Sequence, residues 1–204
     1  MTQERRRSGP ISATELLAQL AADGDYQRAR QKDEAARASV ASELSRAEQP
    51  ILVDLRQAGI RVESVWDLVN TAEPYPSALP VLIDHLERGA YPSRVLNSLG
   101  RALAVRDSER YWERLKAVYL STRDAGAMDG AAVALAAAAS ENVLDDLISF
   151  IDVEDRGETR IYFVRPILRV GGEVGLGLVR ALQHDPFFAK EARLALRGRR
   201  LLDR

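Results

Sequence analysis

The chain has 204 residues, a formal net charge of −1 and no cysteine. The missing cysteines exclude disulfide bonds, thiol catalysis and cysteine-based zinc sites, and the near-zero charge gives no overall field that would attract nucleic acid or an anionic membrane. No run of about 18 apolar residues is present, so we expect no contact with a membrane through a spanning helix. A polar start without the apolar run of a signal peptide makes the cytoplasm the expected location.

The N-terminal residues predict a tail followed by a short helix. Residues 1–10 are polar and are expected to be a disordered tail. Ser12-Ala13-Thr14-Glu15 fits a capping box and predicts a helix that starts there and ends at Asp23-Gly24-Asp25. One face of this helix carries its large apolar residues, Leu16, Leu17 and Leu20.

Residues 26–47 predict a highly charged helix, in which apolar residues recur at a spacing near 3.5: Ala36, Val40, Leu44 and Ala47. This spacing leaves open a polar helix beside the rest of the protein or a weak coiled coil or docking helix through which the protein oligomerises. Pro50 is expected in the first turn of a new helix that buries Ile51, Val53 and Leu55 and ends at Gly59.

Ser64 and Asp67 predict a second capping box. The apolar Trp66, Leu68 and Val69 around them are expected to seal one end of the domain that follows. We therefore assign residues 11–75 to an N-terminal helical extension and cap.

A faint repeat runs through residues 76–199, and residues 200–204 are expected to be a tail. Leu103, Leu135 and Ile167 are 32 residues apart, and Ala195 takes the same place 28 residues later. This period is typical of stacked helix pairs. The first helices are expected at 78–86, 111–120, 143–151 and 174–182, and the second helices at 93–105, 127–139, 158–170 and 187–197. Pro166 is expected to kink or break the second helix of the third pair.

The ends of three second helices are related in sequence: Gly100–Val105, Arg165–Val170 and Arg193–Gly198. The alanine-rich residues 131–139 depart from them and predict very close helix packing. The pattern resembles HEAT-like repeats, particularly the short bacterial kind of about 30 residues. The resemblance implies an all-α fold, a right-handed α-solenoid of about four helical hairpins, with the second helices lining its concave face.

Stacking the second helices in register aligns arginines along that face. Eight residues form the predicted partner-binding face: Arg94, Asn97, Arg101, Tyr162, Arg165, Arg169, Arg193 and Arg197. Such side chains can clamp an acidic peptide, a phosphate or a nucleic-acid backbone. Alternatively, each arginine pairs with a nearby carboxylate and only solvates a helix. Val133 interrupts the aligned arginines in the second repeat.

No residues form a recognisable catalytic, metal or cofactor site. His85 and His184 are expected at the surface near the ends of first helices, and Asp84-His85 has no nucleophile in motif context. The acidic residues Asp145-Asp146 and 152–155 lack the length and glycine of an EF-hand loop.

Residues 171–177 are rich in glycine but follow a helix and match no nucleotide-binding fingerprint. Gly175 and Gly177 are instead expected to permit close helix packing.

The preferred hypothesis is a non-catalytic scaffold that binds a protein partner through its arginine-containing concave face. A nucleic-acid-binding protein related to the HEAT-like DNA glycosylases for alkylated bases is the alternative, although neither Trp66 nor Trp112 matches a catalytic motif of that family. A lyase similar to the HEAT-type bilin lyases, or a chaperone-like protein, is the third hypothesis.

Overall fold

A computed structural model describes residues 11–202 and shows α-helices and 3₁₀-helices without a strand in this range. The predicted all-helical class is therefore confirmed for these residues. The expected tail at 1–10 lies outside them, as do residues 203–204. Residue contacts divide the chain into two units, Met1–Glu43 and Leu44–Arg204, and the division falls inside the long helix α2 (Gly24–Gln57).

In the first unit, helix α1 (Ala13–Ala22) begins at the predicted capping box. The Ser12 hydroxyl accepts a hydrogen bond from the amide of Glu15, and the Glu15 carboxylate accepts one from the amide of Ser12. These bonds favour the charged carboxylate and lower the pKa of Glu15. Asp23 ends α1 and caps the start of α2, because its side chain accepts from the amides of Asp25 and Tyr26.

Helix α2 runs through Pro50, so the prediction of a new helix at this residue is wrong. Proline removes one hydrogen bond from a helix interior, and burial of apolar side chains just after it offsets that loss. Ile51 and Leu55 are buried as predicted, whereas Val53 is 45% exposed and Leu52 is buried in its place, because Ile51, Leu52 and Leu55 share one helical face. The helix ends near Gly59, as predicted, where the amide of Ile60 donates to the carbonyl of Leu55.

The second unit contains the four predicted helix pairs, preceded by helix α3 (Val65–Asn70) at the predicted second capping box. The first helices are α4 (Leu79–Arg88), α6 (Trp112–Ser121), α8 (Leu144–Asp152) and α10 (Gly172–Leu182). The second helices are α5 (Ser93–Ala102), α7 (Ala125–Ala138), α9 (Val164–Val170) and α11 (Ala189–Leu202). Three 3₁₀-helices join them, at Arg106–Tyr111, Glu141–Val143 and Glu154–Phe163.

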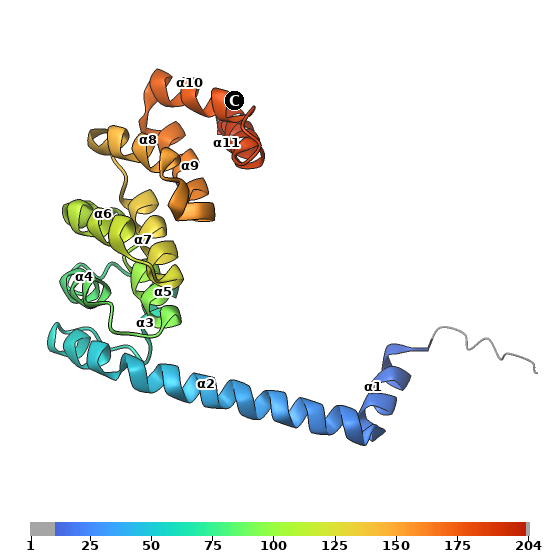
Figure 1. Ribbon diagram of the computed structural model, residues 1–204. Helices are drawn as coiled ribbons and strands as arrows, with labels where there is room; N and C mark the ends of the chain where they lie inside the picture. The colour runs from blue at the N-terminus through green and yellow to red at the C-terminus, as the bar shows by residue number, and fades with distance from the viewer. Residues whose placement is uncertain (1–10, 203–204) are drawn as a thin grey trace, which may run out of the picture. The chain divides into compact units, whose positions relative to one another are not determined.

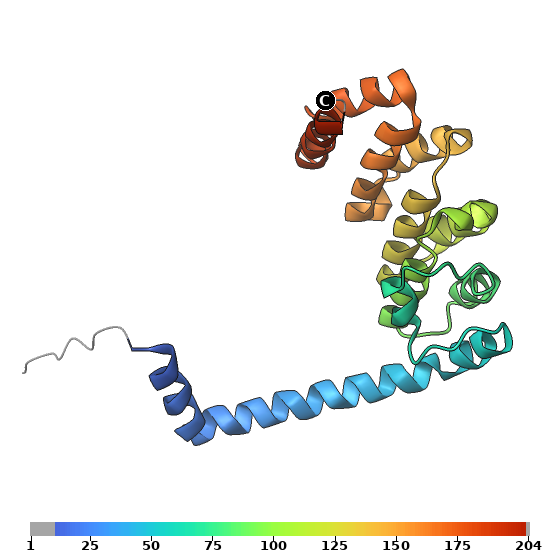
Figure 2. The ribbon, with the colours of Figure 1, turned by 180° about the vertical axis from the view of Figure 1, so that it is seen from behind.

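The helices of this unit form two rows. Both views show α4, α6 and α8 in one row and α5, α7 and α9 in the other (Figures 1 and 2). The helices of each pair contact each other, α5 packs on α7, and α9 contacts both α7 and α11. The repeat leucines Leu82, Leu115 and Leu147 are fully buried, whereas Val179 replaces Leu178 as the buried residue of the last pair. The apolar repeat therefore marks the shared core of the two rows.

The second helix of the third pair differs from the prediction. A 3₁₀-helix covers Glu154–Phe163, with Gly157 in a left-handed conformation, and α9 starts only at Val164. Pro166 consequently lies in the first turn of α9, where an amide has no partner within the helix and its absence costs little. The break thus precedes Pro166, and the expected mid-helix kink is absent.

Helix α10 packs closely on α9 at Gly175 but not at Gly177. A Cβ atom on Gly175 would lie 2.1 Å from the carbonyl oxygen of Ile167, whereas one on Gly177 would meet no atom within 4 Å. The expected close packing therefore holds for the first glycine alone.

Candidate functional site

An open groove runs between α7, α9 and α11, and we call it the α7–α11 groove. It has a volume of about 990 Å³. Its apolar lining comes from all three helices: Val133, Ala136, Ala137, Leu168, Leu194 and Ala195. Tyr162, Arg165 and Arg169 add polar groups to the same surface. The groove therefore combines an apolar floor with two guanidinium groups and one phenol.

Small residues on α7 leave space on this side of the helix. Ala136 and Ala137 contribute one methyl group each, so α9 and α11 side chains do not fill the region above them. Leu194 on α11 remains 43% exposed although it borders the groove. Val133, which interrupts the predicted row of arginines, lies in the apolar floor. Val133 in place of an arginine therefore makes this surface suited to an apolar group of a ligand.

Two of the predicted arginines border the groove and already have partners. The Arg165 guanidinium donates to the Glu191 carboxylate and remains well exposed. Arg169 donates to the carbonyls of Ala136 and Ala139, at 3.1 and 3.2 Å. It therefore satisfies carbonyl groups at the end of α7 and complements the negative end of the helix dipole. Arg165 is the more available of the two for a ligand.

Asn97, Arg101 and Tyr162 meet at Asp129, a residue that the sequence analysis did not single out. Asn97 and Arg101 donate to one carboxylate oxygen, at 2.6 and 3.0 Å, and the Tyr162 hydroxyl donates to the other at 2.8 Å. Burial, followed by the contact with Asp129, raises the pKa of Tyr162. Asp129 thus joins α5, α7 and the 3₁₀-helix before α9. Asp129 follows Asn97 by 32 residues in the sequence, which is the period of the repeat. This spacing is the sequence feature that could have identified Asp129.

The other predicted residues lie apart from the groove. Arg94 and Asn97 line a separate depression of about 560 Å³ that also contains Leu44 and Trp66. Trp66 is 43% exposed there, whereas Leu68 of the same predicted cap is buried. Arg193 donates to the carbonyl of Gln183 at the end of α10.

Arg197 is an exposed residue on α11, outside the groove lining. Three of the eight predicted residues therefore line the α7–α11 groove: Tyr162, Arg165 and Arg169.

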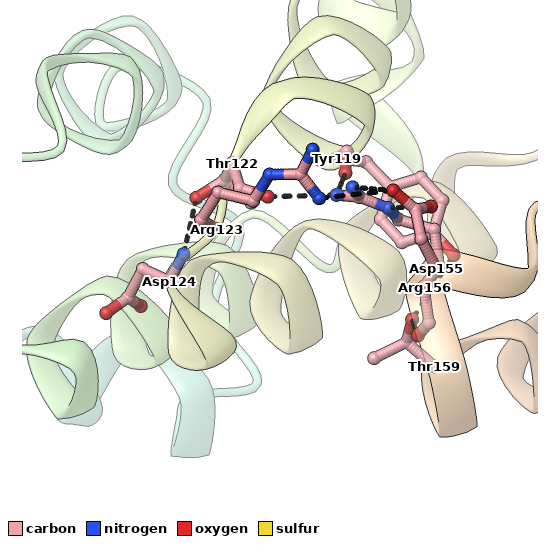
Figure 3. Close-up of polar contacts among 7 residues, drawn as sticks. All are labelled: Tyr119, Thr122, Arg123, Asp124, Asp155, Arg156 and Thr159. Atoms are coloured by element: carbon pink, nitrogen blue, oxygen red, sulfur yellow. Dashed lines mark hydrogen bonds and ion pairs between the residues drawn. The ribbon is translucent and has the colours of Figure 1, made fainter.

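A buried arginine joins the acidic turn to α6 (Figure 3). Arg156 donates to both oxygens of Asp155 and to the carbonyls of Tyr119 and Thr122. The guanidinium of Arg156 lowers the pKa of Asp155 to about 2. Arg156 escaped the sequence analysis because nothing in the sequence distinguishes it from the many exposed arginines.

The other acidic cluster is also engaged by neighbours. Asp146 accepts from the amine of Lys116 and from the indole of Trp112. Among residues 11–202, no three His, Asp or Glu side chains are grouped in a way that could hold a metal ion.

His85 is buried, with 1% of its surface exposed, so the expectation of a surface histidine is wrong at this position. Its Nε2 lies 2.9 Å from an oxygen of Asp54 on α2, and its Nδ1 lies 2.5 Å from the hydroxyl of Tyr91. Asp84, the neighbour considered as its orienting group, pairs with Arg114 instead. His85 therefore fastens the end of α2 to α4, while His184 is exposed as expected.

Comparison with known proteins gives no match to a family model, a curated protein or a solved structure. Within the part of the chain that the structure describes, no helix combines the length and the apolar character needed to cross a membrane.

Proposed function

We propose that the protein is a non-catalytic, HEAT-like α-solenoid that binds a protein partner in the α7–α11 groove. The observation that carries the proposal is the groove itself, which exposes an apolar floor with Arg165 at its border. Exposed apolar surface of this kind is typical of binding sites rather than of ordinary solvated surface. The two rows of helix pairs and the 32-residue period are the support for the HEAT-like classification.

The chemistry of the groove favours a partner helix that carries leucines and carboxylates. A helix that enters an apolar groove is recognised through residues spaced i, i+3, i+4 and i+7, which lie on one face. Leucine side chains would contact Val133, Leu168 and Leu194, and a carboxylate would accept hydrogen bonds from Arg165. The groove is less suited to a nucleic-acid backbone, since its floor is apolar and Arg169 already donates to two carbonyls.

A displayed library of helical peptides would test the proposal. We expect the full-length protein to select peptides with leucine anchors and acidic residues. Leu194→Asp should abolish the selection, because a carboxylate in the apolar floor is costly to bury. Leu120→Asp is the matched control, since Leu120 on α6 is 40% exposed and lies outside the groove. Equal selection by the two variants would contradict the assignment of the groove.

The contribution of charge can be measured with the same peptides. Arg165→Glu should weaken binding of an acidic peptide by about tenfold at low salt, and less at high salt because ions screen exposed charges. Arg110→Glu, at an exposed position on another surface, should leave the affinity unchanged. Identical affinity for the wild type and Arg165→Glu would remove Arg165 from the site.

A further inference from the structure

Helix α1 carries an apolar face that is largely exposed among the described residues of its unit, 11–43. Ala13, Leu16, Leu17 and Leu20 occupy positions i, i+3, i+4 and i+7 of this helix. None of its residues is buried, and Leu17 is 67% exposed. Isolated helices shorter than about 12–15 residues are marginal in water, so a ten-residue helix gains most of its stability from packing. The spacing and exposure together indicate a helix that packs on another surface.

The described residues that follow α1 in the first unit, 23–43, do not supply that surface. The side-chain amide of Gln27 donates to the carbonyl of Leu20, which ties α1 to the start of α2, while Leu16 and Leu17 stay exposed. Residues 28–43 are exposed throughout and form an uninterrupted part of α2. At 1.5 Å per residue these 16 residues are about 24 Å long. This polar segment follows α1 in the chain and offers it no apolar surface.

The α7–α11 groove has the complementary chemistry. Residues 11–27 contain three acidic residues, Glu15, Asp23 and Asp25, and no lysine or arginine. The groove offers an apolar floor together with Arg165 and Arg169. Opposite charges orient two partners as they meet, while burial of leucine side chains provides most of the affinity. The leucine spacing of α1 is also the spacing expected of a helix in such a groove.

We propose that α1 of one molecule docks in the α7–α11 groove of a second copy of this chain. Reciprocal docking of two copies would close a two-fold dimer in which each groove holds the partner's α1. The inference rests on the proposed function, since it names the occupant of the same groove. It assigns the leucines of α1 as anchors and the carboxylates of Glu15 and Asp23 as acceptors for the Arg165 guanidinium.

Size-exclusion chromatography with light scattering on the full-length protein tests the inference. We expect the wild type to reach twice the mass of one chain as its concentration rises. Leu17→Asp and Leu194→Asp should each weaken dimerisation by at least about tenfold, because each removes from both contacts a leucine that the proposed dimer would bury. Leu120→Asp should dimerise like the wild type.

Mixing the two defective variants identifies which surfaces meet. Leu17→Asp retains an intact groove and Leu194→Asp retains an intact α1, so an equimolar mixture should form a heterodimer through one remaining contact. A labelled peptide of residues 11–27 should also bind the Leu17→Asp protein and fail to bind the double variant. A wild type that stays a monomer, a Leu194→Asp protein that dimerises normally, or a mixture that does not associate would each overturn the inference.

The peptide library distinguishes failure of the dimer inference from failure of the proposed function. If the wild type stays a monomer but selected peptides still bind in a manner that depends on Leu194, the groove is a binding site for another protein and α1 is not its ligand. If no peptide binding depends on Leu194, both the inference and the groove assignment fail.

Discussion

Helix α7 takes part in two helix–helix junctions that differ in how closely the backbones approach. On the α5 side, Gly100 and Gly130 face each other, and a Cβ on Gly100 would lie 2.3 Å from a backbone atom of Gly130. On the α9 and α11 side, Val133, Leu168 and Leu194 surround the open groove. Glycines therefore close one side of α7, and side chains of unequal size hold the other side open.

Polar groups reinforce the difference. At the closed junction, the Ser93 hydroxyl donates to Asp124 and accepts from the amide of Gly126, so the start of α7 is tied to the start of α5. At the open junction, Arg169 bridges the gap by reaching the carbonyls of Ala136 and Ala139. Long arginine side chains thus span the space that direct backbone contact closes elsewhere.

The largest expected effect comes from adding one methyl group to the closed junction. Gly100→Ala would place a Cβ against the Gly130 backbone, which cannot move aside without shifting α7. We expect a loss of about 3 kcal/mol in the free energy of unfolding, although alanine is the better helix former. Denaturant titration measures this value.

Gly177→Ala is the matched control for that substitution. A Cβ on Gly177 meets no atom within 4 Å, so the substitution should leave stability unchanged or raise it by up to about 1 kcal/mol. If Gly100→Ala proved as stable as the wild type, the two sides of α7 would not differ in the way described.

The second prediction concerns the contacts of the buried Arg156. Arg156→Met keeps the length of the side chain but removes the donors to Asp155, Tyr119 and Thr122. Because buried carbonyls and a carboxylate lose their partner, we expect a loss of about 2 kcal/mol in unfolding free energy. Arg123→Met removes a highly exposed partner of Asp155 and should cost less than about 1 kcal/mol. Equal losses would show that burial of Arg156 contributes nothing.

Asp129 is the residue at which the closed and open sides are connected. Asp129→Ala leaves Asn97, Arg101 and Tyr162 without their shared acceptor, and because all three are partly exposed we expect a loss of about 1–2 kcal/mol. The carboxylate also contributes to the raised pKa of Tyr162, so the substitution should lower that pKa.

Ultraviolet titration of Asp129→Ala, with Tyr162→Phe to identify the signal, measures the change in the pKa of Tyr162. An unchanged pKa would mean that burial alone raises it.

The sequence predicted the helix pairs because their pattern is local. Leu82, Leu115 and Leu147 recur on the buried face of each first helix, and the capping boxes at Ser12 and Ser64 depend on residues three positions apart. The site was less predictable, because the partner of an arginine is chosen by tertiary packing. Arg165 and Arg169, which were predicted on a common face, both line the α7–α11 groove, but nothing local indicated that Arg169 would hold the carbonyls of Ala136 and Ala139.

The errors have the same origin. Pro50 was expected to start a helix from its local preference, but burial of the following residues keeps α2 continuous through it. His85 was expected at the surface because it lies near the end of a first helix, where a positive charge complements the helix dipole, but its ring is buried against Asp54, 31 residues away in the sequence. A single sequence contains no direct signal for contacts at that separation.

The smallest expected effect is a change in stability at acid pH through the ion pair of Asp155 with Arg156. The pKa of Asp155 is lowered to about 2 in the folded protein, so its charged form is the one that the fold favours. The stabilisation is complete above the ordinary value of about 3.9 and is lost as the pH falls through about 2. Asp155→Asn should therefore flatten the fall of stability between about pH 4 and 2.

Asp152→Asn, at an exposed carboxylate at the end of α8, should keep the wild-type slope over the same range. Because Asp155 is itself exposed, we expect only a shallow difference between the slopes, measured by thermal unfolding at several pH values. Parallel curves for Asp155→Asn and the wild type would mean that the Arg156 guanidinium is held by the two α6 carbonyls alone.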